Sequence, residues 1–353
     1  MINVFSQITI NHFFKNIVTK ILRSYEYAFS LKKYDSFILV YHMVANEKQG
    51  ANLRNNSSTF NVSLDVFEEH LAYLVSHYEI VHLDYLIDEI RNGRSVKGKI
   101  AITFDDGFKD SYESAYPILK KYNVPAVFYL IGNASETNPL IIWWIAIEEV
   151  INSAYKKKLS FHYDDFSINI SINSLANKID AVKKLSSIFM SIPVDKHVSL
   201  LNTIIASLGQ DIVPDHRSLV LSKEMIVEMY SSGLVSFGGH TQSHADLSLI
   251  DNDMLYREIV EQKQALESRL NIPIDSFSYP YGMPRFISEN AVDVVKLAGY
   301  KYAVTGVTGQ LSRNSEDYFM LPRITTTGCK SVHDLKVRIS YAYNKIRSNF
   351  VRS

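Results

Sequence analysis

The segment KIAITFDDGFKDS, residues 99–111, joins an uninterrupted apolar run to two adjacent aspartates and a glycine. Residues 100–104 predict a strand without polar alternation, as expected where helices cover both faces of a parallel sheet. Asp105 and Asp106 repel each other, and both are costly to bury unless a partner compensates their charge. A metal ion is such a partner, so the segment predicts a metal site at the end of a buried strand.

Short apolar runs alternate with helical patterns along most of the chain. We expect strands at residues 36–44, 79–83, 126–131, 235–237, 276–279 and 301–305, and helices at 63–78, 112–122, 252–270 and 290–298. This order of elements is typical of a parallel α/β barrel or a doubly wound sheet.

Composition excludes some classes of function. The 353 residues carry 37 Lys and Arg against 37 Asp and Glu, so no net charge favours nucleic acid, and we expect no nucleic-acid partner. Cys329 is the only cysteine, which rules out an internal disulfide and a cysteine-rich zinc cluster. No run of eighteen apolar residues occurs, so no membrane-spanning helix is expected.

Residues 1–35 have the pattern of an amphipathic helix, with apolar residues such as Phe14, Val18 and Ile21 at helical spacing and lysines between them. The segment lacks the features of a signal peptide. A basic amphipathic helix lies on an anionic membrane surface or packs on its own domain, and both alternatives stay open. We therefore expect a cytoplasmic protein, with peripheral contact to the inner membrane face through residues 10–30 as one alternative.

The α/β alternation breaks between residues 139 and 214, which we interpret as a mainly helical subdomain inserted in one loop. Residues 158–172 alternate around two aspartates and predict a hairpin. Insertions on barrel loops often shape access to the site, and exposed aromatic residues also mark interfaces. The segment is thus a cap over the site or a partner surface, and the sequence leaves oligomeric state open.

His240 and His244 follow a predicted strand and lie four residues apart. In a helix this spacing places both imidazoles on one face, where they can share an ion, although a solvated histidine pair is the commoner case. The carboxyl ends of parallel strands converge on one face of a barrel. One aspartate with two histidines leaves a coordination position open, as in catalytic zinc sites, and the second aspartate is then free to act as a base.

Three motifs together resemble the polysaccharide deacetylases, the NodB-homology or carbohydrate esterase family 4 enzymes. They are TFDDG at residues 103–107, HTQSH at 240–244 and YPYG at 279–282, in the family's order and spacing. The resemblance spans about residues 37–324 apart from the insertion. It implies a distorted (β/α)7 barrel over residues 36–345 and metal-dependent removal of N-acetyl groups from amino sugars.

The resemblance also assigns roles to residues. Asp105 matches the general base, and Asp106, His240 and His244 match the ligands of one divalent metal ion, with Zn²⁺ the first candidate. Tyr281 matches the residue whose backbone N–H stabilises the tetrahedral oxyanion.

Substrate contacts are expected from two places. Tyr279 and Pro280 belong to the YPYG turn, and Trp143 and Trp144 begin the inserted segment. The partner expected at these contacts is an N-acetylated amino sugar.

Two positions depart from the family pattern. Ser278 stands where the family has an arginine that orients the base, and Arg323 is a candidate to supply that guanidinium, with a purely structural role as the alternative. The family's late L-x-H motif, the source of the general acid, has no match. His42, at the end of the first predicted strand, is the candidate acid, as in permuted members that act on poly-N-acetylglucosamine; His82 is a weaker candidate, and a buried structural histidine is the alternative.

The sequence therefore predicts a metal-dependent N-deacetylase that hydrolyses the acetamido group of an amino sugar in a surface polysaccharide, a glycolipid or a precursor. Deformylation of a lipid- or nucleotide-linked sugar needs the same site with a smaller acyl pocket. A carbohydrate-binding barrel without catalysis is the alternative from another class, and the intact carboxylates and histidines argue against it.

Overall fold

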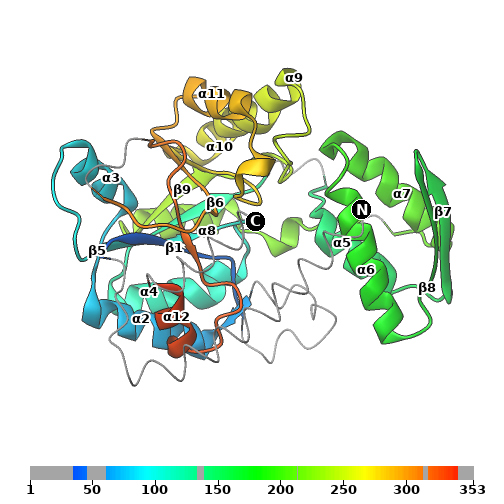
Figure 1. Cartoon of the computed structure of the whole chain (residues 1–353), viewed down its shortest axis with the longest axis horizontal. Helices are drawn as coiled ribbons and strands as arrows, with labels where there is room; N and C mark the ends of the chain where they lie inside the picture. Colours follow the sequence, from blue (N-terminus) through cyan, green and yellow to red (C-terminus); the bar gives the residue numbers. More distant parts are fainter. Residues whose placement is uncertain (1–34, 46–60, 133–138, 213, 313–316, 341–353) are drawn as a thin grey trace.

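The computed structural model describes residues 35–45, 61–132, 139–212, 214–312 and 317–340 (Figure 1). The predicted N-terminal helix of residues 1–35 lies almost wholly outside the described residues, so contact of residues 10–30 with a membrane stays a prediction. None of the helices in the described part of the chain combines the length and apolarity required to cross a bilayer.

A curled parallel sheet forms the centre of the larger part of the chain. Its strands are β1 (Phe37–Tyr41), β4 (Glu79–Ile80), β5 (Lys99–Phe104), β6 (Ala126–Leu130), β9 (Val235–Gly239), β10 (Ser276–Ser278), β11 (Tyr302–Val304) and β12 (Ile324–Thr325). The order is β11-β10-β9-β6-β5-β1-β12, with β4 paired to β5. A parallel bridge between Val304 and Leu321 joins β11 to the segment before β12, so the two ends of the sheet approach each other. The predicted distorted (β/α)7 barrel is confirmed.

Helices lie on both sides of these strands (Figure 1). They are α2 (Leu64–His77), α3 (Leu83–Arg91), α4 (Tyr116–Tyr122), α8 (Lys223–Ser231), α9 (Asn252–Leu255), α10 (Gln262–Leu270), α11 (Glu289–Leu297) and α12 (Val332–Arg338). Residues 100–104 of β5 are all buried because both faces of this strand are covered, as their unalternating sequence predicts. The Ser63 hydroxyl accepts a hydrogen bond from the Val66 N–H and fixes the start of α2.

Among the predicted elements that differ from the structure, two bear on the site. The strand expected at residues 36–44 is interrupted at His42, where the chain leaves the central sheet and β2 (Met43–Ala45) pairs with β3 (Asn61–Ser63) instead. The helix expected at residues 252–270 contains a π-helical segment, η5 (Tyr256–Glu261), between α9 and α10. Both irregularities lie close to the residues of the candidate site.

The insertion forms a unit with its own apolar core, seen beside the barrel in Figure 1. It contains α5 (Trp143–Asn152), β7 (Lys158–Tyr163), β8 (Phe166–Ser171), α6 (Leu175–Phe189) and α7 (His197–Leu208). The predicted hairpin is present as the antiparallel pair of β7 and β8. That the insertion covers the site as a cap stays a prediction.

His216 fastens the base of the insertion, where the chain enters and leaves it. Its Nδ1 accepts a hydrogen bond of 2.8 Å from the Ile142 N–H, its Nε2 lies 3.1 Å from Glu149, and its backbone N–H donates to the Leu140 carbonyl at 2.8 Å. Because Ile142 immediately precedes α5, these bonds fix the direction in which α5 and its two tryptophans leave the barrel.

Candidate active site

The ends of neighbouring strands bring the predicted residues together. Phe104 at the end of β5 pairs with Tyr41 at the end of β1, so Asp105 and His42, the next residues, lie side by side. The Asp105 N–H donates to the Tyr41 carbonyl at 3.0 Å. His240 follows β9 directly, at the same edge of the sheet.

Asp106, His240 and His244 form a compact group with metal-ligating atoms. The Nε2 atoms of His240 and His244 lie 3.5 and 3.6 Å from Asp106 Oδ1, and one ligand atom from each residue lies within 4.8 Å of the others. These distances are long for hydrogen bonds but suit three ligands around one ion, since zinc binds imidazole nitrogen and carboxylate oxygen at about 2.0–2.2 Å.

The polar contacts of these residues fit a bound cation. His240 Nδ1 lies 2.6 Å from the Ser278 carbonyl, which only accepts, so Nδ1 carries the hydrogen and the Nε2 lone pair faces Asp106. Asp106 Oδ1 is buried and has no hydrogen-bond partner among the described residues. Burial lowers the pKa of His244 to about 3, so its imidazole is neutral at physiological pH, as a metal ligand requires.

The two histidines do not lie on a helix, the case in which their spacing would place both imidazoles on one face. Residues 240–244 form a loop in which Thr241 has φ 63° and His244 has φ 56°. Left-handed φ values turn the chain so that both imidazoles reach Asp106. The loop itself was not predicted, because the i, i+4 spacing is compatible with a helix or a turn and the sequence of Thr, Gln and Ser does not distinguish them.

Several residues of the site have backbone conformations that are unfavourable for residues other than glycine. Asp106 (φ 72°) and Tyr281 (φ 60°) share the left-handed conformation of Thr241 and His244. Such conformations are uncommon outside glycine, and they are genuine outliers for a β-branched or bulky residue. Strained residues of this kind cluster at functional sites, where surrounding contacts hold them in place.

Two glycines allow His240 its position. A Cβ at Gly238 would lie 2.5 Å from the Tyr129 ring, and a Cβ at Gly239 would lie 2.3 Å from the Tyr300 hydroxyl. Any larger residue would displace β9 at the point where it delivers His240. The close approach explains the Gly-Gly pair before the histidine motif.

Asp105 is buried against Arg323. The guanidinium donates two hydrogen bonds to the carboxylate, from Nη1 to Oδ1 at 2.8 Å and from Nη2 to Oδ2 at 2.7 Å. Burial opposes ionisation, but the charges of Arg323 and the nearby histidines outweigh it and hold the pKa of Asp105 well below its usual range. Asp105 is therefore an oriented carboxylate at neutral pH, as a general base must be.

Ser278, at the position where the family pattern has arginine, takes part in the same contact. Its hydroxyl donates to Asp105 Oδ2 at 3.3 Å and accepts from Arg323 Nη2 at 2.9 Å. Arg323 also donates to the Thr305 carbonyl through Nε at 2.8 Å. The structure thus places Arg323, the residue before β12, against the predicted base, and its catalytic importance stays a prediction.

Replacing Arg323 by lysine keeps the positive charge but removes the two-pronged contact with Asp105. We expect Arg323→Lys to lower kcat about tenfold or more with little change in KM. With its carboxylate less stabilised, the pKa of Asp105 rises, so activity on the acid side is lost at a higher pH than in the wild type. A pH profile of kcat/KM measures this shift.

Arg257, which is exposed on η5, provides the control. Arg257→Lys should leave both kcat and the pH profile of kcat/KM unchanged. An Arg323→Lys enzyme with wild-type kcat and an unmoved acid limb would show that Arg323 is only structural.

His42 is half-buried at the end of β1. Its charge acts on both aspartates and on His244, lowering the pKa of each carboxyl, which places it at the same centre. His82 is exposed at the start of α3. Of the two histidines proposed as acid, His42 is therefore the one beside the site.

Aromatic rings from two parts of the chain enclose His244. The Trp144 ring of the insertion and the Tyr281 ring of the YPYG turn each lie 4.7 Å from the imidazole, edge to face. Trp144 and Tyr281 are both half-buried, so each retains surface beside the site. The insertion thus touches the candidate metal site directly through Trp144.

Three of the predicted substrate contacts are not available on the surface. Tyr279 is 1% exposed and packs on Phe277 within the main apolar core. Trp143 is 5% exposed and stacks on Phe189 within the insertion, and Pro280 is buried. Of the predicted set, Trp144 is the residue positioned to contact a substrate.

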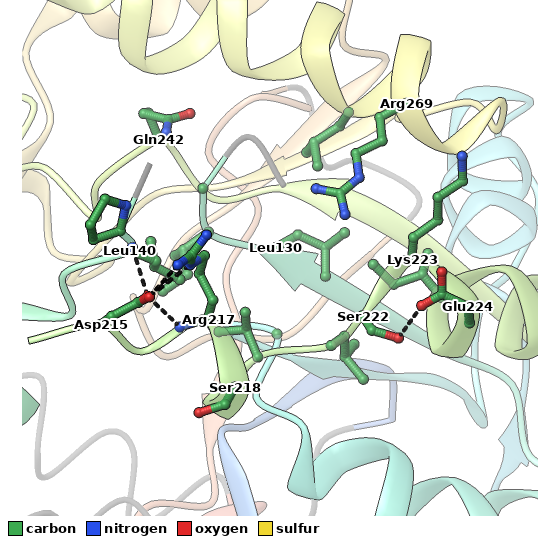
Figure 2. A pocket seen from close by; sticks show the side chains of 18 residues that line it. Leu130, Leu140, Asp215, Arg217, Ser218, Ser222, Lys223, Glu224, Gln242 and Arg269 are labelled. Atoms are coloured by element: carbon green, nitrogen blue, oxygen red, sulfur yellow. Dashed lines mark hydrogen bonds and ion pairs between the residues drawn. The ribbon is translucent and has the colours of Figure 1, made fainter. Parts of the chain in front are cut away.

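A cavity of about 560 Å³ adjoins the site (Figure 2). Its wall comes from the end of β6, the two ends of the insertion, the start of α8 and part of α10. It includes Leu130, Ile131, Leu140, Arg217, Val220, Lys223 and Arg269. Gly107, the residue after Asp106, also lines the cavity, and so does Gln242, which lies between the two histidines in the sequence. The metal-ligating group itself does not line the cavity, which is therefore a neighbour of the candidate centre.

Two residues near the site were missed by the sequence analysis. Glu258 and Gln262, in η5 and at the start of α10, are buried and hydrogen-bonded to the loop of residues 240–244. Their contacts span about fifteen to twenty residues of sequence, and no motif marks them. Their spacing of four residues was the one available signal, and it is common to any helix face.

Comparison with known proteins identifies the family. The polysaccharide deacetylase family model matches residues 92–165 and 192–303, more than half of the chain. The chain belongs to this family. Its members are hydrolases that act on the carbon–nitrogen bond of acetamido sugars, and the match breaks inside the insertion.

Individual relatives agree with this assignment. The chain is 24% identical over 325 residues to a poly-beta-1,6-N-acetyl-D-glucosamine N-deacetylase of Staphylococcus aureus, covering 86% of this chain and 83% of the relative. A polysaccharide deacetylase from Bacillus cereus has a similar fold, with TM-score 0.55 and 19% identity over 87% of this chain and 70% of that one. A Streptococcus pyogenes deacetylase in complex with acetate gives TM-score 0.54 and 19% identity, covering 88% of this chain and all of the other.

Proposed function

We propose that this deacetylase is metal-dependent and removes N-acetyl groups from a β-linked N-acetylglucosamine polysaccharide. The observation that carries the proposal is the convergence of Asp106, His240 and His244 beside an ionised Asp105 held by Arg323. The activity named for the staphylococcal relative, which matches over most of both chains, supports the choice of substrate.

The three ligands would hold one divalent ion, with Zn²⁺ favoured by the nitrogen-rich donor set. Such an ion supplies a Lewis acid that polarises the acetamide carbonyl and promotes ionisation of water. Asp105 lies next to the ligand group, and its carboxylate accepts the proton of the water that attacks the acetamide carbon. Arg323 and Ser278 hold that carboxylate in one orientation while it does so.

The developing oxyanion needs hydrogen-bond donors in fixed positions. The backbone N–H of Tyr281 is a suitable donor, because none of the described residues accepts a hydrogen bond from it. The left-handed φ of Tyr281 and the contact of its ring with His244 fix the direction of this N–H beside the site.

His42 is proposed as the acid that protonates the departing amine nitrogen. It directly follows β1, as Asp105 directly follows β5, so a base and an acid are available from the ends of adjacent strands. An amide nitrogen leaves only after protonation, and histidine is the side chain most often used as a general acid in enzymes.

Removing one ligand tests the metal assignment. His244→Ala should lose most of the bound metal, because the two remaining ligands make a poor site, and should lose acetate release with it. Elemental analysis of the purified variant measures the metal. The exposed His162→Ala, on the hairpin of the insertion, serves as the matched control and should keep both properties. One equivalent of metal retained by His244→Ala would contradict the ligand set.

A further inference from the structure

We propose that Glu258 and Gln262 are positioning residues, which hold the loop of residues 240–244 in the conformation that brings both histidines to one ion. The inference rests on the proposed metal site. It concerns residues that lie outside the three family motifs and touch neither the ligand atoms nor the base.

Glu258 is 3% exposed and binds the centre of the loop. Its Oε2 accepts from the Ser243 N–H at 2.9 Å, its Oε1 accepts from the Ser243 hydroxyl at 2.6 Å, and its carbonyl accepts from the Gln242 N–H at 3.1 Å. One residue therefore satisfies the backbone donors of two consecutive loop residues. Hydrogen bonds to a carboxylate are among the stronger ones in proteins.

Gln262 is fully buried and joins the loop to the sheet. Its Nε2 lies 3.0 Å from the Thr241 carbonyl, 2.7 Å from the Leu130 carbonyl and 3.2 Å from the Gly132 carbonyl. Leu130 is the last residue of β6. It pairs with Gly239 of β9, so the register of these two strands sets the position of His240 along the sheet edge. Gln262 thus ties the strained residue Thr241 to the strand beside it.

The loop needs such support because its conformation is intrinsically unfavourable. Thr241 and His244 both have left-handed φ values, and residues 240–244 belong to neither a helix nor a strand. Without the contacts from Glu258 and Gln262, the residues between the ligands would relax toward ordinary φ values, and the imidazoles would move apart. The π-helical turn that contains Glu258 is a feature often found next to functional sites.

Metal affinity distinguishes this role from a purely structural one. The metal-free proteins are titrated with Zn²⁺ against a chromophoric chelator, and with Co²⁺ for its absorption spectrum, while thermal unfolding without metal reports the fold. We expect Glu258→Ala to bind about 10–100-fold more weakly, the usual effect of losing an outer contact to a metal site, and to alter the Co²⁺ spectrum. Glu258→Gln should recover part of the loss, since its amide oxygen still accepts from the Ser243 N–H.

Two further variants make the result decisive. Ser243→Ala removes only the hydrogen bond from the Ser243 hydroxyl, so it should weaken metal binding less than Glu258→Ala does. The double variant Glu258→Ala/Ser243→Ala should bind metal little more weakly than Glu258→Ala alone, because both changes remove the same interaction. Glu261→Gln, exposed on the same helical segment, should bind as the wild type does.

Wild-type affinity and an unchanged Co²⁺ spectrum in a folded Glu258→Ala protein would overturn the inference. If that variant does not fold, the same result in Ser243→Ala overturns it. A wild-type protein that binds no metal would instead contradict the proposed function itself.

Discussion

Asp105→Asn is expected to keep its metal and lose about 10²–10⁴-fold in turnover, the usual contribution of a general base. The change removes the charge that accepts the proton from water, while Asp106, His240 and His244 are untouched. Asparagine has nearly the shape of aspartate and keeps an oxygen that can accept from Arg323, which donates two hydrogen bonds to the native carboxylate. Acetate release and elemental analysis on the same preparation measure the two properties.

Asp106→Asn is the matched comparison, because it makes the same chemical change at the adjacent aspartate, which is assigned as a metal ligand and not as the base. It should lose metal and activity together, since its carboxylate faces both histidines. Loss of metal in Asp105→Asn, or its retention in Asp106→Asn, would mean that the two roles are reversed or shared.

His42→Ala is expected to retain metal and lose amide hydrolysis by about 10²-fold or more, because the departing amine is then left without its acid. An acetyl ester with a good leaving group needs no protonation to depart, so its hydrolysis should be largely spared. The comparison of the two substrates separates an acid from a residue that merely shapes the site.

His82→Ala supplies the control for this experiment, since His82 is exposed at the start of α3. The His82→Ala variant should hydrolyse both the amide and the activated ester at the wild-type rate. Equal losses on amide and activated ester in His42→Ala would show that His42 has a structural or binding role.

Local patterns were sufficient to predict which residues meet at the site. Each candidate follows an apolar run, and in a parallel sheet the ends of such strands share one edge, so Asp105, His42 and His240 could be brought together without coordinates. Arg323 was proposed instead from the family pattern, as a replacement for the arginine missing at Ser278, and the structure places it on Asp105.

Contacts that depend on the path of the backbone were not predictable in this way. Threonine has no preference for left-handed φ, so nothing in the sequence indicated the turn at Thr241 or its supports Glu258 and Gln262. The burial of Tyr279 was not predicted, because β10 before it is covered on both faces and shows no alternation between a buried and an exposed side. Likewise, the hairpin of the insertion was evident, but the contact of Trp144 with His244 depends on how α5 leaves the barrel.

Acetate release by the metal-stripped protein tests the account most directly. The substrate is an oligomer of β-1,6-linked N-acetylglucosamine, assayed before and after addition of one equivalent of Zn²⁺. The account predicts negligible release without metal and restored release with it, in the wild type but not in His244→Ala. Undiminished release from the fully stripped wild-type protein, or none after any divalent metal is added, would contradict it.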